Sequence, residues 1–398
     1  MFLFQGFGGP GTTNSLGKAF FESVTSPLSG PVPVGADGSM GGAAARQALY
    51  HLRVRRTFAD KKRGALDAMA FTAKVGVTTL LDQVLLAIGF GPRDPQPGHF
   101  LAQLEHFRMY DGWLAVHADG NDFVRLQTNF LHNQGYNADL GGLENQLPAL
   151  RERLKNQFPF FGDELFRTGG IGEWAAPFAG PSNPDGYAVW YEAQRLVAQA
   201  GWRNENSPRN EAAVQQVVET YEVMDAEFGI TDLRWGAQHV EGSTEAQILR
   251  FKDLNCGVSM SGFTWNGATP GPTPTGPNFP MIVGTGIPAA LHQDGVHIAP
   301  HNAWFAMHYA TTGLNHRGEP VNADWQITRE QAVHAYTQAA AWFLNRENDL
   351  GSLEVGKLGD LIVLDRDYFT VTDQSARATL PVMTVVGGKI VHDTGAVG

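Results

Sequence analysis

His292 and Asp294 are two side chains whose spacing points to chemistry. They lie two residues apart in the strand-like stretch 289–294, and residues two apart in a β-strand face the same side. An imidazole beside a carboxylate can bind a divalent metal ion, and it can also act as a metal-free acid/base pair. Both kinds of chemistry stay open at this point. His297 follows the stretch in an expected loop and is a candidate substrate contact.

Two other patterns are weaker guides to function. Cys256 is the only cysteine, so the chain can form neither an intrachain disulfide nor a cysteine-based zinc site. Residues 6–11 match the G-x-G-x-x-G pattern of dinucleotide sites, but Pro10 lies inside the motif and prolines interrupt the following stretch 20–38. We therefore interpret this segment as a tight loop.

The composition excludes several classes of protein. The chain has 398 residues and a formal net charge of −11, and an acidic chain without a stripe of basic residues is a poor candidate for nucleic-acid binding. No apolar run approaches the ~18 residues of a membrane span, and no signal sequence is recognisable. With a single cysteine, these features favour a cytoplasmic location. We expect a small-molecule substrate and neither a nucleic-acid nor a membrane partner. Whether the chain forms a homodimer stays open.

Helix-like and strand-like stretches alternate from about residue 46 onward, which predicts parallel strands with helices outside them. Strands are expected at 76–83, 122–130, 165–173, 233–240, 257–260 and 289–294. Helices are expected at 61–74, 98–110, 187–200, 210–228 and 328–344. Capping boxes at Thr244 with Gln247 and at Thr328 with Gln331 predict two helix starts. On this pattern alone, a barrel and an open doubly wound sheet both fit.

The C-terminal part of the chain has a different character. Residues 359–367 and 382–393 are rich in strand-forming residues, and no helix-like stretch follows them. Gly387 and Gly388 predict a hairpin turn inside the second stretch. We expect a main domain at 1–350 and a small β accessory domain at 351–398.

The C-terminal segment resembles the end of metal-dependent amidohydrolases in GSLEVGKLGDLIVLDRDYF at 351–369 and TVVGGKIVHD at 384–393. The preceding ITREQAVHAYTQAAAWFL resembles the amidohydrolase family 3 branch, which includes N-substituted formamide deformylases. GVTTLLDQ, FRTGGIG, GWRNENSPRNEAA, LRWGAQHVEG and LHQDG are similar to the second, fourth, fifth, sixth and eighth barrel strands. The resemblance implies an α/β fold, a (β/α)8 TIM-type barrel with a small C-terminal β-sandwich remnant. The family's first barrel strand has no counterpart, so the barrel is either incomplete at the N-terminus or completed by residues 2–5.

Most of the family's metal ligands have no match in this chain. The resemblance aligns His239 with the sixth-strand histidine and Asp294 with the eighth-strand aspartate. The fourth-strand lysine is replaced by Gly172, with Glu173 beside it, and the fifth-strand histidine by Asn206. The His-x-His motif of the first strand is absent. We therefore expect at most one weakly held, zinc-like divalent metal ion, through His239 and Asp294, with Glu173 or His292 as a further candidate ligand.

The matched positions also suggest roles in catalysis and binding. All of them should lie at the carboxyl ends of the strands, where barrel enzymes have their active sites. Asp294 and His239 are the candidate catalytic residues, and the candidate substrate contacts are Asn206, Glu173, His292, His297 and Trp265.

These expectations lead to one preferred function and two alternatives. The resemblance implies a hydrolase of carbon–nitrogen bonds other than peptide bonds, in which an activated water attacks an amide-type carbonyl. A metal ion lowers the pKa of water from 15.7 to about 7, which is worth roughly 12 kcal/mol, and a lone carboxylate base does not easily replace it. A metal-free isomerase or lyase on the same barrel is the first alternative. A non-catalytic subunit or an inactive, truncated homologue is the second.

Overall fold

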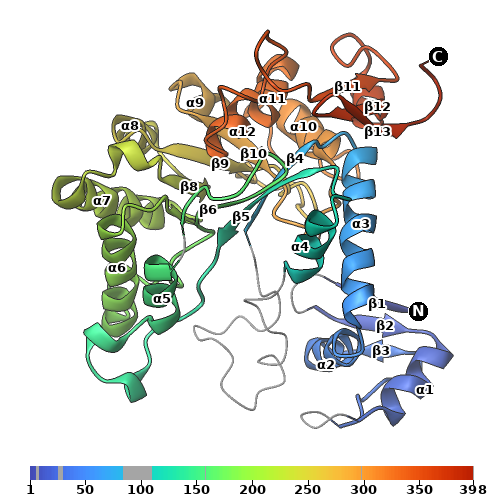
Figure 1. The fold of residues 1–398 in the computed structure, drawn as a ribbon, viewed down its shortest axis with the longest axis horizontal. Helices are drawn as coiled ribbons and strands as arrows, with labels where there is room; N and C mark the ends of the chain where they lie inside the picture. Colours follow the sequence, from blue (N-terminus) through green and yellow to red (C-terminus); the bar gives the residue numbers. More distant parts are fainter. Residues whose placement is uncertain (6–8, 26–29, 84–109, 157, 297, 398) are drawn as a thin grey trace. The chain divides into compact units, whose positions relative to one another are not determined.

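The structure is a computed structural model that describes the chain except residues 6–8, 26–29, 84–109, 157, 297 and 398 (Figure 1). It contains two compact units. The first comprises Met1–Asp67 and Leu85–Asn121, and the second comprises Ala68–Val84 and Asp122–Gly398. Residues 98–109 of the expected helix at 98–110, and the candidate substrate contact His297, lie outside the described residues.

The first unit contains a small antiparallel sheet. Its strands are β1 (Phe2–Phe4), β2 (Gly11–Thr13) and β3 (Ser39–Met40), in the order β1-β2-β3. The helices of this unit include α1 (Ser15–Ser23), α2 (Gly42–Arg53) and α4 (Asp111–Ala118). Phe2 pairs with Thr13 in this sheet, so the proposal that residues 2–5 complete the barrel is wrong. The segment finds an antiparallel partner nearby in the chain instead.

Among the residues that the structure describes, seven parallel strands form the centre of the second unit. One sheet has the order β4-β5-β6, and another has the order β10-β9-β8-β7. A parallel bridge between Ile171 and Asn204 joins the two sheets at β6 and β7. The strands are β4 (Thr79–Gln83), β5 (Arg125–Phe130), β6 (Phe166–Ile171), β7 (Glu205–Asn206), β8 (Gly236–His239), β9 (Gly257–Ser261) and β10 (Ala289–His292). The expected strand–helix alternation and parallel pairing are therefore confirmed.

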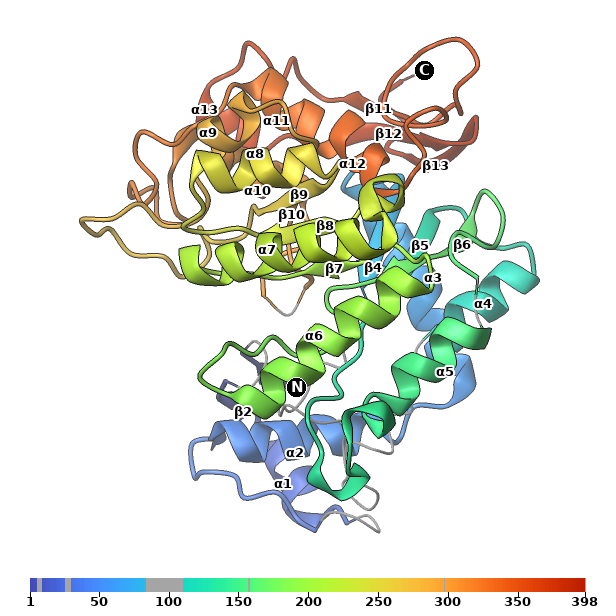
Figure 2. The same ribbon diagram turned by 90° about the vertical axis from the view of Figure 1, so that its left-hand side faces the viewer.

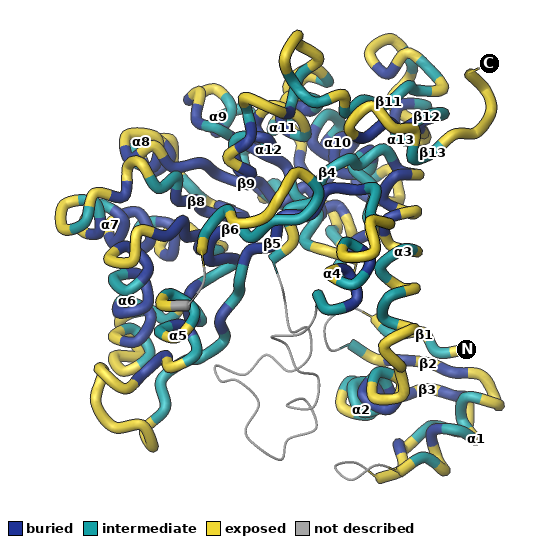
Figure 3. The backbone as a smooth tube through the Cα atoms, in the orientation of Figure 1, coloured by how far each residue is buried: buried dark blue, intermediate teal, exposed yellow. Residues whose placement is uncertain are grey.

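Of the two forms expected for the barrel, the structure has the open one. Among the described residues, no strand pairing joins β10 to β4, so the barrel is not closed. Strands β8 and β9 are buried along their whole length (Figure 3), as expected for parallel strands that have both faces covered.

Helices cover the outer face of the strands in the second unit (Figure 2). The rings of Tyr221 and Trp235 pack edge to face with centroids 4.8 Å apart, between α7 and the entry to β8. Such aromatic pairs stabilise the contact beyond the area that they bury. Helix α3 (Phe58–Lys74) begins in the first unit and ends in the second. The other helices of the second unit are α5 (Pro148–Asn156), α6 (Pro184–Gln199), α7 (Glu211–Phe228), α8 (Glu245–Asp253), α9 (Phe279–Gly284), α10 (Ala303–Thr312), α11 (Arg329–Tyr336), α12 (Gln338–Phe343) and α13 (Asp373–Arg377) among the described residues. The 3-10 turns are η3 (Ala138–Leu140), η4 (Leu143–Asn145) and η5 (Ile230–Leu233).

Both predicted capping boxes are confirmed, at Thr244 with Gln247 and at Thr328 with Gln331. The single helix expected at 328–344 is wrong, because it breaks into α11 and α12 at Thr337. This residue has φ −119° and ψ −85°, and its hydroxyl donates to the carbonyl of Val333. Threonine side chains that bond the preceding turn in this way compete with regular helix geometry.

A separate antiparallel sheet forms near the C-terminus, as predicted. Its strands β11 (Leu361–Leu364), β12 (Pro381–Val386) and β13 (Lys389–Asp393) follow one another, with a hairpin at Gly387 and Gly388. Within the second unit, this sheet is tied to the parallel strands by an ion pair between Arg125 and Asp360, 2.9 Å from Nε to Oδ2. In the described part of the chain, none of the helices has the length and apolar character needed to span a membrane.

Candidate active site

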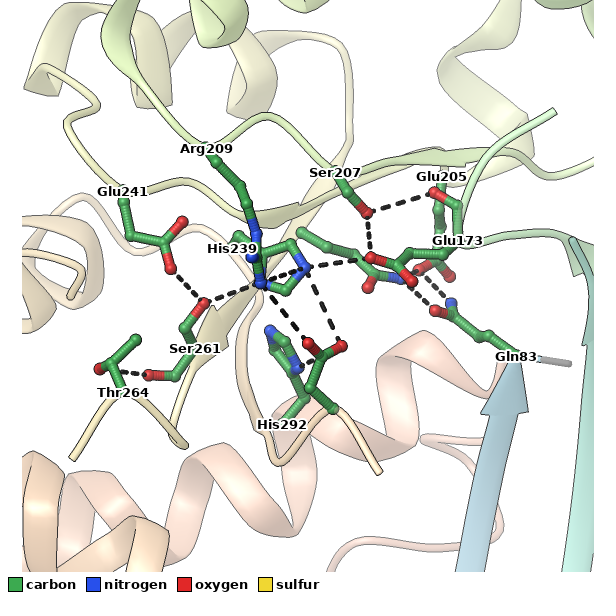
Figure 4. A network of polar contacts seen from close by, with 12 residues as sticks. Gln83, Glu173, Glu205, Ser207, Arg209, His239, Glu241, Ser261, Thr264 and His292 are labelled. Carbon is green, nitrogen blue, oxygen red and sulfur yellow. Dashed lines mark hydrogen bonds and ion pairs between the residues drawn. The ribbon is translucent and has the colours of Figure 1, made fainter. Parts of the chain in front are cut away.

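Polar side chains gather where β8, β9 and β10 end, all within the second unit (Figure 4). His239 is the last residue of β8, Ser261 the last of β9 and His292 the last of β10. Because the strands are parallel, their carboxyl ends meet at one edge. His239 and Asp294 have positive φ angles of 67° and 59°, a conformation that is rare outside glycine and concentrated at functional sites.

His239 lies at the centre of a chain of hydrogen bonds. Its Nδ1 is 2.8 Å from the hydroxyl of Ser261, and its Nε2 is 3.0 Å from Oε1 of Glu173. The Ser261 hydroxyl in turn donates to Oε1 of Glu241 at 2.6 Å. Both ring nitrogens therefore have partners, which fixes the orientation of the imidazole.

Glu173 links the end of β6 to the end of β8. Its Oε1 also accepts a 2.7 Å hydrogen bond from the hydroxyl of Ser207. Burial acts to raise the pKa of this carboxyl, but the hydrogen bonds from His239 and Ser207 outweigh it and the pKa is lowered. Glu173 is therefore ionised at neutral pH and can accept a proton.

His292 and Asp294 extend the cluster from the end of β10. Nδ1 of His292 is 4.0 Å from Oδ1 of Asp294, and the rings of His292 and His239 have centroids 4.8 Å apart. Nε2 of His292 is buried and has no hydrogen-bond partner among the described residues. Burial, with smaller electrostatic effects of the neighbouring His239 and Arg209, lowers the pKa of His292 well below its ordinary value, so the ring is neutral and has a free lone pair.

Asp294 has a pKa well above the ordinary value of an aspartate. Burial and the nearby carboxylates Glu173 and Glu241 raise it to about 6, against the opposing effect of His239 and Arg209. Its Oδ1 is 3.9 Å from Nε2 of His239. A carboxyl that titrates near neutral pH suits either proton transfer or metal binding.

The donor set of this cluster fits one divalent metal ion. His239, His292 and Asp294 each offer a ligand atom, and these atoms all lie within 4.8 Å of one another. Two imidazoles and one carboxylate are a common ligand set of catalytic zinc sites, which leave a fourth position open. The buried, unpartnered Nε2 of His292 is the observation that supports a missing ligand partner.

Arg209 is the cation of the cluster. Its Nη2 is 3.2 Å from Nδ1 and 3.4 Å from Nε2 of His239, and 3.5 Å from Oδ2 of Asp294. The guanidinium also lies over the ring of Phe263, 5.7 Å from its centroid. Although Asp294 is largely buried, the side chain of Arg209 is 53% exposed.

The structure separates Asn206 from the cluster. Its side chain bonds Gln194, Tyr221 and Trp190 in the helix layer, at 2.7, 3.0 and 3.2 Å. Because successive strand residues point to opposite sides, the neighbours Glu205 and Ser207 face the other way. Ser207 takes the place that was expected for Asn206 at the mouth, the edge where the carboxyl ends of β8, β9 and β10 meet.

The remaining expected residues are placed as follows. Glu173 and His292 join His239 and Asp294, as described above. Trp265 is buried and packs edge to face against Phe305, with centroids 5.7 Å apart.

Four residues of the cluster were not predicted from the sequence: Ser207, Arg209, Glu241 and Ser261. Glu241 lies two residues after His239, so the spacing that selected His292 and Asp294 would also have selected it. No pattern in the sequence indicates the position of Arg209, because it lies in the loop after β7.

A second polar cluster fills the strand interior next to the mouth. Glu205 accepts from Nε2 of Gln83 at 2.6 Å, from Nδ2 of Asn129 at 3.1 Å, and also from Gln238. Nη2 of Arg203 forms an ion pair with Glu205 at 2.7 Å, and both side chains are only 1% exposed. We call Glu205 and these four partners the interior cluster.

Comparison with known proteins indicates one protein family. A sequence profile described as the amidohydrolase family matches residues 46–392. Imidazolonepropionase from Bacteroides fragilis is 38% identical over 65 residues, which is 16% of this chain and 16% of that protein. Imidazolonepropionase from Bdellovibrio bacteriovorus is 32% identical over 80 residues, 20% of this chain and 19% of that protein. The similarity thus spans about a fifth or less of these curated relatives.

Solved structures agree on the fold. An uncharacterised metal-dependent hydrolase from Pyrococcus horikoshii OT3 superposes with a TM-score of 0.58 at 12% identity, covering 92% of this chain and 71% of that one. A mutant of atrazine chlorohydrolase from Arthrobacter aurescens TC1, complexed with zinc and atraton, gives a TM-score of 0.57 at 15% identity, with 88% and 76% covered. At these identities the likeness concerns the fold alone.

Proposed function

Because the chain belongs to the amidohydrolase family, we propose that it hydrolyses carbon–nitrogen bonds other than peptide bonds, with water attacking an amide-type carbonyl carbon. The observation that carries this proposal is the convergence of His239, His292 and Asp294 at the ends of β8 and β10. The imidazolonepropionases and the chlorohydrolase are named for reactions at small organic molecules, which is consistent with a small-molecule substrate.

His239, His292 and Asp294 are the residues that would hold one divalent metal ion. Such an ion supplies Lewis acidity, which eases the ionisation of water by several pKa units. Two imidazoles match zinc better than the amide of Asn206 would. Glu173 is not needed as a ligand, because its carboxylate already accepts from His239 and Ser207.

Glu173 and Asp294 are the proton acceptors that this mechanism requires. Glu173 is ionised and lies beside His239, so its carboxylate can itself accept a proton from water at the ends of these strands while it orients the imidazole. Asp294, with a pKa of about 6, can hold a proton and return it to the leaving amine. A group that titrates near the working pH does this most effectively.

A metal-free isomerase or lyase is the second candidate function. The observation that favours it is the resident positive charge of Arg209 beside His239 and Asp294, which balances the carboxylates without a metal ion. In that case Asp294 is the base and a histidine is the acid.

One experiment separates the two. The purified chain is dialysed against a mild chelator, its metal content is measured by plasma mass spectrometry, and turnover of a panel of amides and formamides is followed before and after one equivalent of zinc. We expect turnover to vanish on dialysis and return with zinc. Hydrolysis that persists without metal, or no hydrolysis in either state, would contradict the proposal.

A further inference from the structure

Arg209 brings a positive charge to the side chains that would hold a metal ion. Its Nη2 lies within 3.5 Å of both ring nitrogens of His239 and of Oδ2 of Asp294. Two of the three candidate ligands therefore face the guanidinium already. A cation and a guanidinium cannot share these partners without strong repulsion at such short range.

The acidic surroundings explain why a cation sits there. Glu173, Glu241 and Asp294 lie around His239, and Oε2 of Glu241 is buried without a partner among the described residues. Buried carboxylates are costly unless a positive charge is close. Arg209 supplies that charge in the absence of metal.

The contacts of Arg209 are weak enough to be exchanged. Within the described part of the chain, its polar contacts with His239 and Asp294 all run from Nη2. The ring nitrogens of His239 are already bonded to Ser261 and Glu173, and the contact to Asp294 is long and single. Arginine binds carboxylates most strongly through two parallel bonds, and that arrangement is not present here. With half of its side chain exposed, Arg209 can move into solvent at little cost.

We propose that Arg209 is an internal cation that competes with the metal ion for His239 and Asp294, so that metal entry requires the Arg209 side chain to leave the cluster. The site then has two states, one neutralised by arginine and one by metal. This inference rests on the proposed function only for the identity of the ligands, because it concerns metal affinity and not the reaction catalysed.

The test compares zinc affinity by competition with a chromogenic chelator. Arg209→Met should bind zinc at least tenfold more tightly than the wild type, a difference of about 1.4 kcal/mol. Arg209→Lys, which keeps the charge and loses the planar fork, should fall between the two. The matched control is Arg317→Met, because Arg317 has the same 53% exposure and pairs with Glu319; its affinity should stay within twofold of the wild type.

Three results would overturn the proposal. These are an unchanged affinity in Arg209→Met, a weakened affinity, or an equal gain in Arg317→Met, which would make net charge the only cause. The hydrolysis assay is read separately. Tighter zinc binding without any amide turnover would support the competition and reject the proposed function, whereas turnover with unchanged affinity would do the reverse.

A measurement on the wild-type chain covers the case in which the variants do not fold. Phenylglyoxal modifies exposed arginines, and peptide mass spectrometry reports how fast each one reacts. Zinc should increase the reactivity of Arg209 relative to Arg317 at least twofold, because metal binding releases its side chain. Protection by zinc, or no change, would contradict the displacement.

Discussion

The interior cluster around Glu205 and the cluster around His239 at the ends of β8, β9 and β10 are both charged, yet they differ in how their carboxylates are paired and in how exposed the balancing arginine is. In the interior cluster, both carboxylate oxygens of Glu205 are bonded, and a buried arginine balances its charge. At the mouth, Nε2 of His292 and Oε2 of Glu241 have no partner among the described residues, and the balancing arginine is half exposed. Nη1 and Nη2 of Arg203 also lack hydrogen-bond partners among the described residues, but Nη2 forms the buried ion pair with Glu205. A buried ion pair whose carboxylate oxygens are all bonded holds a fold together, whereas unpartnered ligand atoms beside a half-exposed cation leave room for a ligand.

The largest expected effect tests the interior cluster. Glu205→Ala should lower the free energy of unfolding by about 3–5 kcal/mol, because it leaves the charge of Arg203 buried and unpaired. Urea denaturation followed by circular dichroism measures it. Glu164→Ala is the control, since Glu164 is a largely exposed partner of Arg125 at 3.9 Å and should cost less than about 1 kcal/mol. A Glu205 variant as stable as this control would end the distinction between the clusters.

Asp294→Asn tests the mouth through activity. We expect turnover of an amide substrate to fall at least ~100-fold, because the amide can neither accept a proton nor bind metal as a carboxylate does. Asp253→Asn, at the exposed end of α8, should retain full turnover. Comparable losses in both variants would show that the effect is not local to the mouth.

The Asp294→Asn variant should be more stable than the wild type at neutral pH, whereas Glu205→Ala should be less stable. The pKa of Asp294 is raised from 3.8 to about 6, so the folded chain retains a proton that the unfolded chain loses between these values. The favourable contribution is therefore present at pH 3.8 and below, and is lost as pH rises through 6. At pH 7.5 without metal, Asp294→Asn should be more stable than the wild type by roughly 1–3 kcal/mol, with the gain shrinking toward pH 4. If Asp294→Asn were less stable than the wild type at pH 7.5, Asp294 would stabilise the fold in the way that Glu205 does in the interior cluster.

The smallest effect concerns zinc binding as a function of pH. Binding requires the ionised carboxylate of Asp294, so zinc affinity should be nearly constant above pH 7 and fall about tenfold per pH unit below 6. Chelator competition across pH 5–8 measures this, with the chelator's own protonation corrected. The Asp294→Asn variant should bind more weakly and show a shallower slope. A wild-type profile that is flat down to pH 5 would remove Asp294 from the ligand set.

Local signals predicted much of the helical and strand framework. The capping boxes at Thr244 and Thr328 and the hairpin at Gly387 each depend on a few neighbouring residues, and such contacts can be read from spacing. The break at Thr337 was missed because a residue of ordinary helix propensity left the helix through its own hydroxyl bond to Val333.

The chain by itself determined that His239 and His292 end parallel strands and that Asp294 follows two residues later, since alternation and strand order place such residues at one edge. Only the tertiary structure decided what surrounds them. A shift of one residue along β7 turned Asn206 to the helices and Ser207 to Glu173, and face is set by packing across the sheet. Arg209 lies in the loop after β7 and meets His239 and Asp294, at the ends of β8 and β10, only in the folded chain. No short stretch of sequence contains that information.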